Sequence, residues 1–338
     1  MPRHRLALAL TVYGGGAGLG GAISVAAGGV LLGYALAHGA FVLPLIGEVR
    51  PWQFVLLLSG LPGLLIAPLI FLAPEPDRRD LLREARGDAA MSVGLWQFMR
   101  ERGRLMVSIV AGFSVLQILS YSFSSWQPTY LVQRFGWNIS KVGLALATGM
   151  VLSFCGAFGA GWIVDKLVAR GRVDAPLRWA GGVALTSSVL IALAFEVDSA
   201  WGCVILVTIA QLPLALIGIL STALQQVTPN EYRGRVSAIF LLCGNLVGFG
   251  FGPLLPAWIT DHVFADQALL GHSIALVAAS AGAVSAVLLW SGCAPLRAAL
   301  IAARLWTSAG RDEHPPSTST NEQGALAGVP RATAAADA

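Results

Sequence analysis

The chain has 338 residues, of which 56% are hydrophobic and only 12% are charged. A soluble domain carries about 25% charged residues, and here the charges gather between long apolar runs. These runs are continuous and do not alternate as barrel strands do, so composition predicts an all-α polytopic protein in a lipid bilayer. Membrane topology explains the net charge of +4, and we expect no nucleic-acid partner.

Eight apolar runs are long enough to cross a hydrocarbon core, which requires about 20 residues. If the N-terminus is cytoplasmic, every Lys and Arg except Arg50, Arg134 and Lys141 falls on the cytoplasmic side. The positive-inside rule therefore predicts a multi-pass protein of a bacterial inner membrane with both termini cytoplasmic. The expected spans are 7–36, 52–73, 105–125, 142–164, 179–196, 201–225, 236–259 and 268–291.

A charged segment, 75–104, divides the apolar runs into residues 1–74 and residues 105–295. Within it, Asp80 to Arg86 and Gln97 to Arg102 have the pattern of surface helices, and a solvated connector is the alternative. The C-terminal tail, 296–338, is rich in Pro, Ser, Thr and Ala beyond its first residues. Such composition predicts a disordered cytoplasmic tail.

No catalytic constellation is visible in the sequence. The chain has no His-Glu-x-x-His or Gly-x-Ser-x-Gly motif, and no paired carboxylates inside a span. Asp165 and Glu196 lie at the ends of spans, and the four cysteines lack metal-ligand spacing. We therefore expect no enzyme, no cofactor and no metal, and the sequence favours a conduit for a small-molecule solute.

Uncharged polar side chains mark the candidate cavity. Gln117, Tyr121 and Ser124 are spaced i, i+4, i+7, which puts them on one helix face. Gln211 and Asn245 lie in two later spans. An amide that faces lipid costs several kcal/mol, so these side chains point into the bundle. There they line a solute cavity or, as the alternative, hydrogen-bond to other helices for stability.

Glycine and proline punctuate two spans. Pro213 is expected to bend the span 201–225, because proline disrupts the helical hydrogen-bond pattern. The span 236–259 follows a basic turn and carries a ladder of glycines before Pro253. Glycine costs about 1 kcal/mol in a helix relative to Ala, so a ladder indicates close helix packing. The glycines are Gly244, Gly248, Gly250 and Gly252.

Three aromatic residues lie near the outer end of the third span. Trp126, Tyr130 and Trp137 are within or beside the loop that we expect after residue 125. Tryptophan and tyrosine concentrate at membrane–water interfaces. We therefore expect an interface belt here, with a role in substrate binding as the alternative.

The inner end of the fourth span resembles a loop motif of the major facilitator superfamily of secondary transporters. Gly161-Trp-Ile-Val-Asp165-Lys166 runs into Arg170-Gly-Arg172 and is similar to that family's Gly-x-x-x-Asp-Arg/Lys loop. Val168 stands where the family often repeats a glycine. The resemblance implies a cytoplasmic charge latch in which Asp165 interacts with Arg170 or Arg233, with Lys166 as a further latch residue.

Two further stretches carry the resemblance. Gly248-x-x-x-Gly252-Pro253 resembles the family's Gly-Pro packing motif, and Gly20, Gly28 and Gly29 resemble the motif of its fifth helix. Spans 7–36 and 236–259 would then be equivalent helices of two pseudo-symmetric halves. Residues 1–74 would be the last two helices of the first half, and 105–295 the six-helix second half. The resemblance therefore implies an N-terminal truncation that removes helices one to four.

The resemblance covers residues 1–295, and its motifs look most like those of bacterial spinster-like members. It implies transport of a small organic solute by alternating access, with symport of a coupling proton in the complete protein. No carboxylate lies in mid-span to carry that proton, so proton coupling is an expectation from the family alone. The alternatives are a membrane binding or sensor protein without transport, and an inactive truncated transporter.

Overall fold

The structure, a computed structural model, describes residues 6–39, 41–43, 47–72, 88–214, 216–229 and 232–301. This part of the chain is helical apart from turns and one short antiparallel hairpin, β1 (Phe41–Leu43) with β2 (Gly47–Val49). It contains eight helical stretches that are long and apolar enough to cross a membrane. The predicted all-α polytopic fold and its eight spans are confirmed, and the chain is a multi-pass membrane protein.

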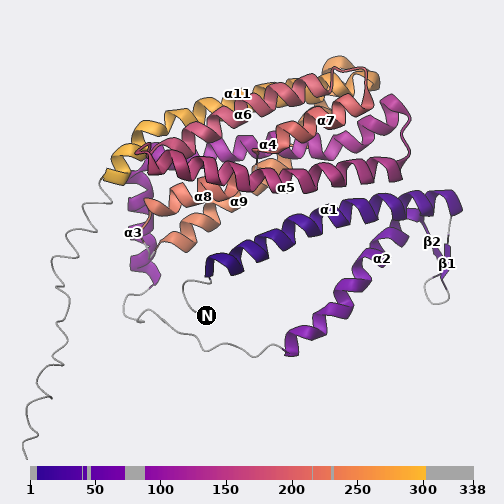
Figure 1. Cartoon of the computed structure of the whole chain (residues 1–338), viewed down its shortest axis with the longest axis horizontal. Helices are drawn as coiled ribbons and strands as arrows, with labels where there is room; N and C mark the ends of the chain where they lie inside the picture. The colour runs from indigo at the N-terminus through magenta and orange to yellow at the C-terminus, as the bar shows by residue number, and fades with distance from the viewer. Residues whose placement is uncertain are drawn as a thin grey trace, which may run out of the picture.

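The first helices form an arm beside the main bundle (Figure 1). Helix α1 (Leu6–His38) lies along α5 (Ile139–Ala169), and α2 (Pro51–Ile66) projects away from the bundle. Helix α2 buries none of its described side chains and continues as the 3-10 helix η2 (Ala67–Leu72). An all-round apolar helix of this length is typical of a membrane span.

The connector contains one described helix, α3 (Asp88–Glu101). This helix includes most of the predicted surface helix at Gln97 to Arg102. The other predicted helix, Asp80 to Arg86, lies outside the described residues.

The remaining helices pack as a bundle around α4, α6 and α11 (Figure 1). Its core holds large side chains from α4, among them Ile109, Phe113 and Leu116, all nearly inaccessible to solvent. The bundle elements are α4 (Gly103–Phe135), α5, α6 (Ala175–Ala194), α7 (Ala200–Gln211), α8 (Leu216–Gln226), α9 (Arg233–Phe251), α10 (Leu254–Trp258), the π-helix η3 (Ile259–Phe264), the 3-10 helix η4 (Gln267–Leu269) and α11 (Leu270–Ser291).

Two spans break at their prolines. Helix α7 ends at Gln211 before Pro213, which confirms the predicted disruption of that span, and α9 ends just before Gly252 and Pro253. Helix α4, in contrast, passes through Pro128 and continues to Phe135. It ends at Gly136, whose left-handed backbone (φ 65°) is the usual helix C-terminal conformation of glycine.

The helical backbone after α11 continues over residues 293–301. The first residues of the predicted tail, 296–301, are therefore helical. The rest of that tail, 302–338, lies outside the described residues.

Candidate functional site

The glycine ladder of α9 packs against α4. A Cβ atom at Gly248 would lie 2.6 Å from the Tyr121 ring and 2.7 Å from the Gln117 Cβ, and one at Gly252 would lie 2.6 Å from the Tyr121 Cβ. A Cβ at Gly244 would collide with the ring of Phe113. Real Cβ atoms do not approach this closely, so the contact between the two helices needs glycine at all three positions.

Tyr121 and Asn245 join the same two helices by a hydrogen bond. The Tyr121 hydroxyl donates to Asn245 Oδ1 at 3.1 Å, and Asn245 Nδ2 donates to the Leu241 carbonyl at 2.9 Å. The Tyr121 ring also packs on Phe249, with 4.0 Å between ring centroids. Asn245 therefore positions Tyr121, which is the stabilising role that the sequence left as the alternative.

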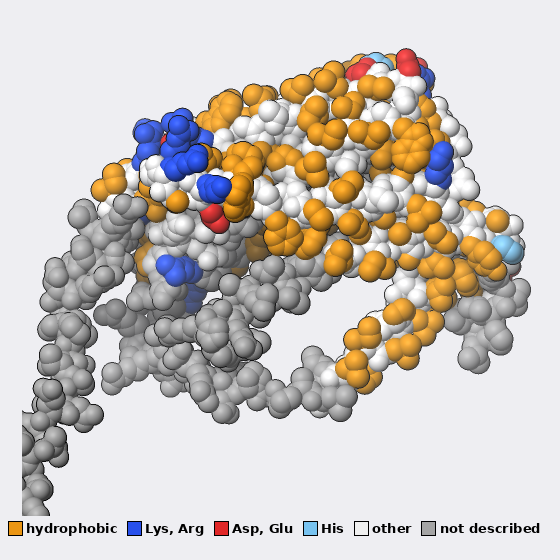
Figure 2. Space-filling model, in the orientation of Figure 1, with side chains coloured by type: hydrophobic (Ala, Val, Ile, Leu, Met, Phe, Trp, Pro, Cys, Tyr) orange, Lys and Arg blue, Asp and Glu red, His pale blue; other side chains and the backbone are white. Residues whose placement is uncertain are grey.

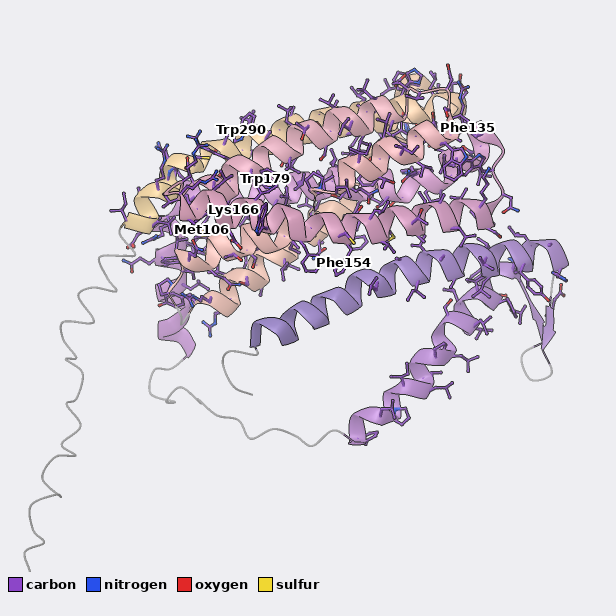
Figure 3. The ribbon with its side chains drawn as sticks, in the orientation of Figure 1. Met106, Phe135, Phe154, Lys166, Trp179 and Trp290 are labelled. Atoms are coloured by element: carbon purple, nitrogen blue, oxygen red, sulfur yellow. The ribbon has the colours of Figure 1, made fainter. Side chains whose placement is uncertain are left out.

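A cavity of about 420 Å³ opens beside this seam. Four of the five predicted cavity residues line it, namely Gln117, Tyr121, Ser124 and Gln211. Its volume falls in the range of about 300–1,000 Å³ that is usual for small-molecule sites. The full lining is Gln117, Ser120, Tyr121, Phe123 and Ser124 of α4, Met150, Ser153, Phe154 and Ala157 of α5, and Gln211 and Leu214; Phe154 is labelled in Figure 3.

Two glycines of α5 bring the opposite wall of the cavity close. A Cβ at Gly149 would lie 2.8 Å from the Thr208 hydroxyl oxygen, and one at Gly156 would lie 2.5 Å from the Leu212 carbonyl oxygen. The second contact falls on the break after α7, where the helix ends at Gln211. Close approach at this break sets Ser153 of α5 in the same cavity as Gln211.

The cavity offers hydrogen-bonding groups without charge. Its lining contains amides, hydroxyls, aromatic rings and aliphatic side chains, and no Asp, Glu, Lys or Arg. Within the described residues there is also no cluster of His, Cys, Asp and Glu that could hold a metal ion. Such a lining suits a small molecule that combines apolar surface with a few hydroxyl or carbonyl groups.

The residues of the predicted latch lie at the end of α5 and the start of α9. We call this end of the bundle, which also carries Arg178 and Arg297, the basic end. The Asp165 side chain is exposed, and no described residue forms an ion pair with it. Lys166 Nζ lies over the Trp162 ring, 3.5 Å from its centroid, and Arg170 is the exposed C-cap of α5. Arg233 Nε donates to the Thr228 carbonyl at 3.1 Å. The structure therefore does not join Asp165 to either arginine, and the latch stays a prediction.

Sequence reasoning missed a charge cluster at the start of α6. The carboxylate of Asp174 is almost buried and accepts a hydrogen bond from Arg178 Nε at 2.6 Å, with Arg297 Nε at 3.6 Å. Burial alone raises the pKa of Asp174, but the hydrogen bond from Arg178 and the charges of Arg178 and Arg297 outweigh it and lower that pKa. The i, i+4 spacing of Asp174 and Arg178 was the available signal.

The glycines of α1 meet α5 in a register different from the expected motif. A Cβ at Gly29 would lie 2.8 Å from the Gly143 Cα, but Gly20 and Gly28 have no atom within 4 Å of such a Cβ. Gly21 and Gly33 face Met150 and Ser140 instead. Of the three glycines chosen by resemblance, only Gly29 therefore makes a close contact.

The predicted aromatic belt is wrong for Tyr130. This residue is buried, and its hydroxyl donates to the Phe195 carbonyl at 2.8 Å. Trp126 donates through Nε1 to the Pro253 carbonyl at 2.8 Å, which ties α4 to the break after α9. The error arose because α4 continues past residue 125 and carries both side chains into the bundle.

The structure thus combines paired membrane helices, glycine-packed seams and a mostly apolar cavity that contains amide and hydroxyl groups. The family model described as Major Facilitator Superfamily matches residues 1–253. The chain belongs to the major facilitator superfamily, as the sequence motifs predicted.

Curated relatives of the chain are transporters. It is 25% identical to an MFS-type efflux pump of Mycolicibacterium smegmatis, over 76% of this chain and 60% of that protein. It is 24% identical to a probable galactarate/D-glucarate transporter of Bacillus subtilis, over 70% of this chain and 55% of that protein. A hexuronate transporter of Bacillus subtilis is 25% identical over 72% of this chain and 60% of that protein. The chain thus spans 55–60% of the length of these relatives.

A solved structure shares the fold. The inward-facing, unoccupied form of a bacterial homolog of the human lysosomal transporter Spinster superimposes with a TM-score of 0.61 at 20% sequence identity. The match covers 91% of this chain and 73% of that one. The chain therefore shares the fold of that structure.

Proposed function

We propose that the protein moves a small polyhydroxylated organic acid across a membrane by alternating access. The observation that carries the proposal is the cavity beside the α4–α9 seam, whose mostly apolar wall has no charged residue and carries amides and hydroxyls. Relatives named for galactarate, D-glucarate and hexuronate transport support sugar acids as the solute class. Amides and hydroxyls suit such solutes because each can donate and accept hydrogen bonds with a sugar hydroxyl.

The lining divides the work of binding between polar and apolar groups. Gln117, Gln211 and Ser153 supply hydrogen bonds, and Phe123 and Phe154 supply surfaces for the C–H faces of the solute. No cation lines the cavity, so these residues bind the hydroxylated part of the solute. Its carboxylate then needs a cationic partner outside this lining.

Alternating access in this account follows the two-halves organisation that we propose for the chain. Residues 1–74 belong to one half, 105–295 to the other, and 75–104 connect them. The tight seam supports movement of α4 and α9 as one unit, since three glycines and one hydrogen bond hold them together. Asp165 would act as a latch toward Arg170 or Arg233 when the halves rock.

Ion coupling and orientation complete the proposal. The cavity lining has no carboxylate, so a coupling proton must bind a carboxylate elsewhere. We place the protein in a bacterial inner membrane with both termini cytoplasmic. The distribution of Lys and Arg supports this orientation. Collapsing the pH gradient across the membrane should abolish concentrative uptake while leaving exchange intact.

Counterflow in proteoliposomes tests the function. Vesicles that contain the protein and unlabelled galactarate, D-glucarate or a hexuronate should accumulate the labelled solute. Gln117→Ala and Gln211→Ala should each lower the initial rate about tenfold, since a lost hydrogen bond in a desolvated site is worth about 1 kcal/mol or more. Gln133→Ala is the matched control, because this exposed glutamine lies on α4 outside the cavity.

Each result of that experiment has a clear reading. Solute binding without exchange would replace transport by the binding or sensor function. If no sugar acid is bound or exchanged, the proposed solute class is refuted. Asp165→Asn should slow exchange without reducing membrane insertion, and an unchanged rate would remove the latch from the mechanism.

A further inference from the structure

A second cavity lies at the basic end of the bundle, between α6 and the helical residues that follow α11. It has a volume of about 480 Å³ and is separate from the solute cavity. Basic side chains gather on the surface at this end (Figure 2). The lining consists of Arg178, Trp290, Cys293, Ala294 and Arg297.

The charges of this cavity are incompletely balanced. Arg178 and Arg297 share one carboxylate, that of Asp174, and each faces it through its Nε atom. No other described residue forms a hydrogen bond or ion pair with either guanidinium group. The two arginine side chains remain 61% and 50% exposed, whereas the Asp174 side chain is 9% exposed. The cavity therefore presents a net positive charge and free guanidinium N–H donors.

Trp290 fixes this cavity at the edge of the membrane. Its indole Nε1 donates to the Arg178 carbonyl at 3.3 Å, and its ring lies against Gly181, where a Cβ would be 2.6 Å from Cδ1. The side chain is partly exposed beside the basic end (Figure 3). Tryptophan prefers the level of the lipid headgroups, so both arginines lie at the depth of lipid phosphates.

An apolar surface continues from the cavity toward the middle of the bundle. Hydrophobic side chains cover the visible face of the bundle next to the basic cluster (Figure 2). Helices α6 and α11 also carry exposed apolar side chains that would contact acyl chains in a bilayer. They are Leu185 and Val189 of α6, and Val284 and Val287 of α11.

We propose that this cavity is a binding site for an anionic phospholipid. Arg178 and Arg297 bind the headgroup phosphate, because guanidinium groups form paired, charge-assisted hydrogen bonds with phosphate oxygens. Asp174 holds both arginines in position. A soluble phosphate ion has the same headgroup chemistry, but the apolar surface beside Trp290 stabilises only a ligand with acyl chains.

Native mass spectrometry of the purified full chain in detergent tests this proposal with phosphatidylglycerol as the anionic lipid and phosphatidylcholine as the zwitterionic one. The wild-type protein should retain phosphatidylglycerol at least tenfold more strongly than phosphatidylcholine. The double substitution Arg178→Gln, Arg297→Gln should abolish this preference. Arg297→Gln alone should weaken it several-fold while leaving the bond between Asp174 and Arg178 intact, so a folding defect in the double variant does not decide the result.

Arg134→Gln is the matched control, because it removes an exposed arginine paired with Asp198 at the far end of α4. It should leave lipid retention unchanged. Millimolar inorganic phosphate should not displace the bound lipid. An unchanged preference in Arg297→Gln and in the double variant would overturn the proposal, as would equal retention of the two lipids. Efficient displacement by phosphate would instead assign the cavity to a soluble anion and contradict the lipid site.

Discussion

Helices α9 and α1 both carry a row of glycines, but the two rows meet different kinds of partner. Gly244 and Gly248 of α9, with Gly252 at its C-cap, press on side chains of α4, including two that line the cavity. Gly29 of α1 presses on the backbone of α5 at Gly143, and Gly21 faces Met150, one lining residue of the cavity. The first seam therefore presses on two cavity-lining side chains, whereas Gly29 in the second seam meets backbone alone.

The comparison also shows what selects the glycines that matter. Residues four apart share a face of a helix, and the α9 contacts follow that spacing. On α1 the face toward α5 holds Gly21, Gly29 and Gly33, one register away from Gly20 and Gly28. Likeness to a family motif located the helix, and the partner helix determined which glycines make the contacts.

The largest expected effect is from Gly248→Val. The new side chain would collide with Gln117 and Tyr121, and overpacking of this kind costs up to about 3 kcal/mol. We expect a clearly lowered unfolding temperature in detergent together with loss of solute binding. Gly250→Val is the control, since a Cβ there meets no atom within 4 Å. Equal behaviour of the two variants would show that the seam is not tightly packed.

Gly29→Val should have a smaller effect, about 2 kcal/mol, and should spare the cavity. The added atoms would push α1 from α5, because the backbone at Gly143 cannot yield. A disulfide between cysteines at positions 33 and 140 reports this separation, as Gly33 and Ser140 are in direct contact. Its formation should be slowed by Gly29→Val and unaffected by Gly28→Val. Equal slowing by both would contradict the register described above.

Tyr121→Phe isolates the polar part of the α4–α9 seam. It removes the hydrogen bond to Asn245, which is worth about 0.5–1.5 kcal/mol. A double-mutant cycle with Asn245→Ala should give a coupling free energy in that range. A coupling near zero would mean that glycine packing alone holds the seam.

A third helix pair, α6 with α11, differs from the two glycine seams because it lies beside charged residues. Its contribution to stability therefore depends on pH. The pKa of Asp174 is lowered in the folded protein, so its ionised form stabilises the fold above the ordinary carboxyl pKa of about 3.9. That contribution is lost as the pH falls through the lowered pKa. Asp174→Asn should flatten this acid limb of the stability curve, whereas Gly29→Val should only shift the curve. Identical acid limbs in wild type and Asp174→Asn would contradict this role.

Much of the fold and part of the site follow from the sequence alone. Eight long apolar runs admit few structures other than membrane helices. The spacing of Gln117, Tyr121 and Ser124, together with the cost of exposing the Gln211 amide to lipid, predicted four side chains that line one cavity. These signals are local, since one helix and its own periodicity contain them.

The missed features depend on contacts between distant segments. Ser153 and Phe154 line the cavity only because Gly149 and Gly156 let α5 approach the end of α7. Arg297 forms an ion pair with Asp174 although the two residues are far apart in the sequence. No periodicity within a single helix carries this information, and it becomes visible only when the helices are packed.

The central claim is that the solute occupies the cavity between α4, α5 and the end of α7. Protection of Ser153→Cys from a polar maleimide tests it most directly, in a detergent-solubilised protein whose native cysteines are replaced by alanine. Ala169→Cys is the reference, because position 169 is exposed at the end of the same helix. Saturating galactarate or a hexuronate should slow labelling at position 153 at least fivefold and leave position 169 unchanged. Equal labelling of position 153 with and without every sugar acid tested would contradict the account.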